Sequence, residues 1–211
     1  MIDINQPSIA IIIDCWDRSD PSIQTNILYF LDSPRSSSHG IIDYLNSDYS
    51  SQIETVVLAS YNCYDEKDTV WHQNYDKFFN DKHKTRTLID LHYMTTIFNR
   101  FYRPYPVERT HPRILNYVNP NKFQIAMHWG WQLEYYLSMN PHIKNVYVFG
   151  QAWEICVKIR PLGYEALSEI PNINILTKRS CVKIESGLQF PNLNIDPNWE
   201  KVIDDIYYYK G

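Results

Sequence analysis

The sequence predicts an α/β fold in which a mainly parallel, open sheet lies between two layers of helices. Short apolar runs such as "SIAIII" and "NVYVFG" have the continuous hydrophobicity of strands that are buried on both faces. Segments with helical spacing alternate with these runs, which is typical of parallel sheets covered by helices. The 211 residues fit one three-layer αβα domain over residues 1–211, long enough to bury its own core.

The first half of the chain supplies two predicted strands. Residues 8–14 are an apolar run that ends at Asp14, and residues 54–62 repeat the pattern. Ile, Leu and Tyr at helical spacing predict three helices, and prolines stop the last of them. The predicted helices are 21–32, 41–47 and 87–101. The segments 63–87 and 100–113 are expected to be insertions.

The second half continues the alternation. Apolar content and β-branched residues predict the strands 113–118, 145–150, 173–177 and 181–184. Length and periodicity predict the helices 122–140, 161–170 and 199–210. A proline at the start of the second of these helices suits a first helical turn. The stretch 190–198 is expected to be extended or coil.

Composition excludes several classes of protein. The net charge is −4 with scattered Lys and Arg, so we expect no nucleic-acid surface. Cys15, Cys63, Cys156 and Cys181 form no CxxC pair, which argues against a zinc site or a disulfide scaffold. The longest aliphatic run is too short to cross a bilayer, and the first residues lack the pattern of a signal peptide. We therefore expect a cytoplasmic protein with no membrane contact.

The predicted topology brings chemically active residues to one edge of the sheet. Asp14, Cys63 and Cys156 all fall near the carboxyl ends of predicted strands, where open α/β sheets place their sites. Cys156 follows Gly150 by six residues, at a predicted strand-to-helix turn. A thiol at such a turn gains thiolate character from helix amides, although a free cysteine is also a common buried apolar residue.

The segment "VYVFGQAWEICV" resembles the nucleophile segment of the isochorismatase-like cysteine hydrolases, the isochorismatase and nicotinamidase superfamily. "AIIIDCWD" is similar to that family's first strand, and "KFQIAMHWGWQLEYYLSM", which opens near Phe123, to the helix before its nucleophile strand. The resemblance implies a Rossmann-like, isochorismatase-like fold. It also implies that Asp14 is a general base, Cys156 a nucleophile, and the amides near Ala152 and Cys156 an oxyanion hole.

Three features depart from the family pattern. The family has a catalytic lysine on the strand before the long helix, where this chain has Asn116 and Tyr117; Lys122 and Arg113 are the nearest candidates for a compensating cation. Without a cation, Cys156 is expected to remain a thiol. Pro161 should end the helix that follows the cysteine, and Glu154 disfavours a thiolate.

Three further segments leave alternatives open. Asp65, Glu66, Asp68 and His72 lack the Asp-x-His pair that some family members use for a metal, so we favour a solvated acidic loop, no metal and no cofactor. "HWGWQ" predicts a packed helix face more than a ligand platform. The Arg- and Pro-rich stretch 100–113 suits either a surface loop or an anion-binding or partner-docking segment.

These observations favour a divergent isochorismatase-like protein with lost or altered catalysis that serves as a binding or structural subunit. Its partner is then a protein or a second copy of the chain, with Tyr102, Tyr105 or the run 207–209 in the interface. The alternative is a cysteine hydrolase that acts on a small amide, imidate or vinyl-ether substrate through Asp14 and Cys156. A generic nucleotide or small-anion binder has no glycine-rich motif to support it.

Overall fold

The computed structural model describes residues 2–17, 40–59, 69–83, 85–86, 109–110, 112–151, 153–184 and 190–211. The predicted helices 21–32 and 87–101 lie outside these residues, as do Tyr102 and Tyr105. The strands are β1 (Ser8–Ile13), β2 (Trp16–Asp17), β3 (Ile53–Ala59), β4 (Arg109–Thr110), β5 (Phe123–Met127), β6 (Asn145–Gln151), β7 (Asn174–Lys178), β8 (Val182–Lys183), β9 (Trp199–Ile203) and β10 (Ile206–Tyr209). The helices are α2 (Ile41–Asn46), α3 (Val70–Phe78), α5 (Pro112–Tyr117), α6 (Gly130–Met139) and α7 (Tyr164–Leu167).

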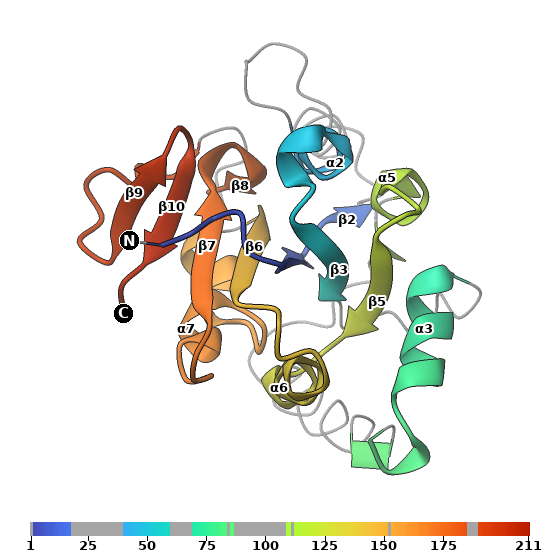
Figure 1. The fold of residues 1–211 in the computed structure, drawn as a ribbon. Coiled ribbons are helices and arrows are strands. Elements are labelled where there is room, and N and C mark those ends of the chain that lie inside the picture. Colours follow the sequence, from blue (N-terminus) through green and yellow to red (C-terminus); the bar gives the residue numbers. More distant parts are fainter. Residues whose placement is uncertain are drawn as a thin grey trace, which may run out of the picture.

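Eight strands form one mixed sheet in the order β5-β3-β1-β6-β7-β10-β9, and β8 also pairs with β6 (Figure 1). Neighbours from β5 to β7 are parallel, whereas β10 is antiparallel to β7 and β9. The α/β class predicted from the sequence is therefore confirmed. β2 and β4 pair separately as a two-stranded sheet.

Both faces of the sheet are apolar because its central strands are hydrophobic runs. Alternate residues of β1 point to opposite faces. Ile9, Ile11 and Ile13 join one buried cluster, and Ala10 and Ile12 join another. The first cluster receives side chains from α6 and α7, and the second from α2 and α5. Figure 1 shows α2 and α5 on one side of the sheet and α6 and α7 on the other.

Three predicted elements differ from the structure. Residues 113–118, predicted as a strand, lie in helix α5 and the turn after it; Ile114 and Val118 are both buried, as expected for residues four apart on one helix face. The predicted helix 122–140 is instead strand β5, a turn and helix α6. The side chain of Gln132 makes this break, because its Oε1 accepts hydrogen bonds from the amides of His128 and Trp129.

The third difference is at the carboxyl terminus. Residues 199–210, predicted as a helix, form the hairpin of β9 and β10. Asp204 takes a positive φ of 46°, which closes the turn between the two strands. The three tyrosines of residues 207–209 favour a strand, and β10 places them between β7 and β9. Tyr207 is thereby buried within the chain itself, and its hydroxyl donates to Asn194.

Candidate functional site

The carboxyl ends of the parallel strands meet at one edge of the sheet. Ile13 of β1 pairs with Ala59 of β3 and with Gly150 of β6, and Ala59 pairs with Met127 of β5. The residues that follow these strand ends therefore lie around a common area. Asp14 and His128 are two of them, and the turn that carries Cys156 follows β6.

Asp14 directly follows the last residue of β1. Its φ is 52°, a left-handed conformation that Asp adopts more readily than most residues. Its side chain is 5% exposed, so the carboxylate needs partners within the protein. A strained, buried aspartate at a strand end is a feature of functional sites.

Gly150 allows β6 to approach β1 closely at the same edge. Its φ is 137°, and a Cβ placed on it would lie 2.1 Å from the carbonyl oxygen of Ile13. No side chain fits in that gap. The glycine that sequence reasoning treated as a turn signal therefore also sets the distance between the two strands that lead to Asp14 and Cys156.

Cys156 lies in a single π-helical turn, Trp153–Val157. Buried side chains at both ends anchor this turn: Trp153 packs on Tyr164 and Trp199 with ring centroids 5.1 Å apart in each case, and Val157 is fully buried. Cys156 itself is half-buried. The helical stretch ends at Ile159, two residues before Pro161, so the array of amides behind the cysteine is short.

Arg160 is the cation of this site, and sequence reasoning did not identify it. It lies one turn beyond Cys156, and its backbone amide donates to the Cys156 carbonyl oxygen at 3.1 Å. Its Nε and Nη2 both lie 2.9 Å from Asp14 Oδ2. The carboxylate is thus paired with a guanidinium whose side chain is 25% exposed. The i, i+4 spacing of Cys156 and Arg160 was the available signal in the sequence.

Asp14, Cys156 and Arg160 act on one another. Burial and, to a smaller extent, the negative charge of Asp14 raise the pKa of the Cys156 thiol to about 12, although the guanidinium of Arg160 lowers it. The thiol also interacts by hydrogen bonding with both side chains. The three groups therefore form one coupled cluster, in which the thiol keeps its proton at neutral pH while the ion pair is intact.

A narrow cavity opens beside the ion pair. Asp14, His128 and Arg160 supply its polar groups, and Ile13, Ala59 and Leu162 supply apolar wall. Its volume of about 10 Å³ holds one water-sized group. His128 is buried at the carboxyl end of β5. β5, and not the predicted strand 113–118, is the strand before helix α6, and His128 directly follows it.

The other predicted site residues are placed elsewhere. Lys122 precedes β5 at the opposite, amino edge of the sheet, where its Nζ donates to the carbonyl oxygens of Ser50 and Ile53 at 2.7 and 2.8 Å. Arg113 belongs to α5, and its side chain is outside the described residues, as is Ala152. Cys15 and Cys181 are fully buried, and burial raises the pKa of both thiols.

The described residues contain no group of three His, Cys, Asp or Glu side chains arranged to hold a metal ion. His72 is buried on α3, and its Nδ1 shares a 2.8 Å hydrogen bond with Thr69 Oγ1. Asp65, Glu66 and Asp68 lie outside the part that the structure describes. None of the helices within the described ranges has the length and apolar character needed to span a bilayer.

Comparison with protein-family models, with curated proteins and with solved structures found no significant match to the chain. Membership of the isochorismatase-like superfamily therefore stays a prediction, carried by the motifs around Asp14 and Cys156.

Proposed function

We propose that the chain is a cysteine-dependent hydrolase of small carbonyl substrates, built on a three-layer, isochorismatase-like αβα domain. One observation carries the proposal: the thiol of Cys156 lies in a coupled cluster with the Asp14 carboxylate and the Arg160 guanidinium. A nucleophile, a base and a cation that fixes the base are the parts that covalent acyl transfer needs. Sequence analysis identified the nucleophile and the base, but it did not identify Arg160 as the cation.

In the proposed reaction Asp14 accepts the thiol proton as Cys156 Sγ bonds to the carbonyl carbon of the substrate. The carbon–oxygen or carbon–nitrogen bond of the leaving group breaks, and the leaving group takes the proton from Asp14. Water then attacks the thioester, gives one proton to Asp14, and the carbon–sulfur bond breaks. The thiolate recovers that proton, which returns the enzyme to its starting state.

Arg160 has two roles in this scheme. Its Nε and Nη2 both contact Oδ2 of Asp14 and so hold the carboxylate in place. Its positive charge also offsets the charge that develops on sulfur, since it lowers the pKa of the thiol against the effects of burial and Asp14. The amides at 152 and 156 complete the scheme as the oxyanion hole that the family resemblance implies.

A second candidate function is a non-catalytic binding subunit. The observation that favours it is the protonated thiol: a pKa raised to about 12 makes proton transfer to a carboxylate strongly uphill. The narrow cavity beside the ion pair also has room for little more than one water. In this alternative Asp14 and Arg160 are a structural ion pair that closes the edge of the sheet.

Acylation by p-nitrophenyl acetate, which delivers only a small acetyl group, distinguishes the hydrolase from the non-catalytic binding subunit. A hydrolase should release a burst of about one equivalent of p-nitrophenolate, followed by steady turnover. Mass spectrometry should locate the acetyl group on Cys156, and the Cys156→Ser variant should lose the burst. Absence of a burst in the folded wild-type protein would overturn the hydrolase proposal and leave the binding subunit.

A further inference from the structure

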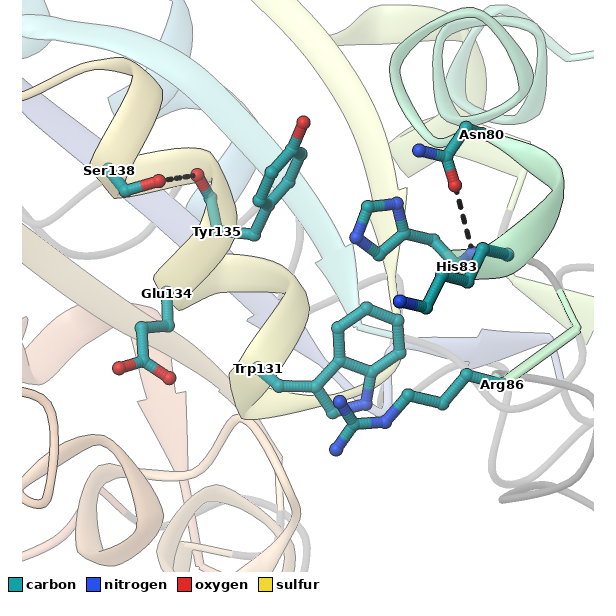
Figure 2. Close-up of a pocket in the computed structure, with 8 residues that line it drawn as sticks. Asn80, His83, Arg86, Trp131, Glu134, Tyr135 and Ser138 are labelled. Atoms are coloured by element: carbon teal, nitrogen blue, oxygen red, sulfur yellow. Dashed lines mark hydrogen bonds between the residues drawn. The ribbon is translucent and has the colours of Figure 1, made fainter.

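A second concave site lies apart from Cys156, between helix α6 and the residues that follow α3 (Figure 2). Its volume is about 610 Å³, within the range of roughly 300–1,000 Å³ that is typical of small-molecule sites. Figure 2 shows Trp131, Glu134, Tyr135 and Ser138 along the α6 wall and Asn80, His83 and Arg86 on the other.

Packed aromatic rings form the floor of this pocket. The imidazole of His83 lies 4.6 Å from the ring of Tyr135 and 5.6 Å from the indole of Trp131, nearly parallel to the indole. His83 also contacts Phe79 at 5.8 Å, and Phe79 is 1% exposed within the main core. The floor is therefore tied to the core, while Trp131 and Tyr135 keep part of their rings accessible.

The charges around the pocket differ from those of the whole chain. Among the described residues that line the pocket, two are exposed cations, Lys82 and Arg86, and one is an acid, Glu134, in a protein whose net charge is −4. The guanidinium of Arg86 lies 4.5 Å from the centre of the indole of Trp131, so this cation is held at the pocket. A local positive excess over an aromatic floor attracts a flat anion.

We propose that this pocket binds a small aromatic acid, a planar ring that carries one carboxylate or phosphate group. The ring packs against Trp131 and Tyr135, and the acid pairs with Arg86 and Lys82. Glu134 disfavours a second acid on the ligand and accepts a hydrogen bond from an amino or hydroxyl group on the ring. The site is independent of the chemistry at Cys156, so the Cys156→Ser variant binds as the wild type does.

Calorimetric titration of the full chain tests the site with three probes: 4-aminobenzoate, adenosine monophosphate, and aniline as a ring without an acid. At least one acid should bind saturably below about 5 mM, and aniline should bind at least about tenfold more weakly. Tighter binding of 4-aminobenzoate indicates a carboxylate ligand, and tighter binding of adenosine monophosphate a phosphate ligand. Either preference supports the proposal.

Variants distinguish binding in this pocket from nonspecific binding elsewhere on the protein. Arg86→Gln should weaken binding of the acid about tenfold, and Trp131→Leu should do the same through the ring. Lys201→Gln, an exposed cation on β9 at the far edge of the sheet, should change nothing. Arg86 and Lys82 are exposed, so Arg86→Gln and Lys82→Gln remain informative if Trp131→Leu does not fold. The proposal is overturned if neither acid saturates, or if Arg86→Gln and Lys82→Gln both bind like the wild type.

Discussion

Each edge of the parallel sheet carries a charge that is at least partly buried, and the two charges have different kinds of partner. At the amino edge Lys122 donates to two backbone carbonyl oxygens. At the carboxyl edge Asp14 is paired with Arg160, beside a thiol and a cavity. The lysine's partners are fixed acceptors that cannot change protonation. Its role is to join the chain before β5 to the turn before β3.

Lys122 is a structural charge and Asp14 a candidate catalytic one, and their partners distinguish them. Burial lowers the pKa of Lys122, and hydrogen bonds to backbone oxygens offset the cost of burying its charge. The carboxyl edge instead couples Asp14, Arg160 and Cys156, so a change in one alters the others. Coupled titratable groups beside a cavity are the physical requirement for proton transfer.

The largest effect is expected at Gly150. The Gly150→Ala substitution places a Cβ 2.1 Å from the Ile13 carbonyl oxygen at a φ of 137°, so β1 and β6 must separate. We expect a loss of about 4 kcal/mol in the free energy of unfolding. Gly130→Ala is the control, since its Cβ would meet Pro161 at 3.3 Å and should cost less than about 1 kcal/mol. Chemical denaturation measures both, and equal costs would contradict the close approach of the strands.

The second prediction concerns the ion pair at the carboxyl edge. Arg160→Gln leaves Asp14 without its cation, and a loss of about 2 kcal/mol is expected because a quarter of the Arg160 side chain is exposed. Acylation of Cys156 should fall with it. Lys158→Gln removes a neighbouring exposed cation that pairs with Glu165, and should shift stability by less than about 0.5 kcal/mol. Denaturation midpoints that move alike in both variants would count against a special role for Arg160.

The third prediction concerns the amino edge. Lys122→Met keeps the side-chain stem but leaves the carbonyl oxygens of Ser50 and Ile53 without their donor. The expected loss is about 1.5 kcal/mol of unfolding free energy. The acylation rate of Cys156 should stay within twofold of the wild type, a factor of about two being small against a catalytic contribution. A large drop in that rate would show that the two edges are not separate in function.

The smallest effect is the pH dependence that Cys156 contributes. Its pKa rises from 9.0 in the unfolded chain to about 12 in the fold. Above pH 9 the folded state therefore holds a proton that the unfolded state loses, and stability falls as the pH rises. Between about pH 8 and 10 the wild type should lose roughly 1 kcal/mol more than Cys156→Ala, a figure reduced for the partial exposure of the thiol. If the stability of the wild type and of Cys156→Ala changed equally with pH, the fold would not raise the pKa of Cys156.

The sequence predicted the fold where apolar runs are continuous. β1, β6 and β7 begin and end within one residue of their predicted ranges, and β3 begins one residue before its predicted range and ends three residues earlier. A parallel strand buried on both faces leaves a plain hydrophobic signal. It failed at β5 and α6, where the apolar pattern runs through both and only the capping by Gln132 separates them. It failed again at β9 and β10, where the turn at Asp204 carries no glycine.

The candidate site was predicted in part. Asp14 and Cys156 could be named because each follows a strong strand. Arg160 was missed, because its i, i+4 spacing from Cys156 does not by itself show that its side chain pairs with Asp14 after β1. His128 was assigned to a packed face of the predicted helix 122–140, whereas it directly follows strand β5. Long-range placement of side chains, unlike strand burial, is set by backbone details that periodicity does not encode.

Alkylation of Cys156 by iodoacetamide as a function of pH tests the central claim that Asp14 and Arg160 control this thiol. Peptide mass spectrometry follows Cys156 separately from the other cysteines. The wild type should react slowly at neutral pH, consistent with a pKa of about 12. Asp14→Asn should shift the profile to lower pH and Arg160→Gln to higher pH, because the carboxylate raises the thiol pKa and the guanidinium lowers it. Identical profiles in all three proteins would contradict the account.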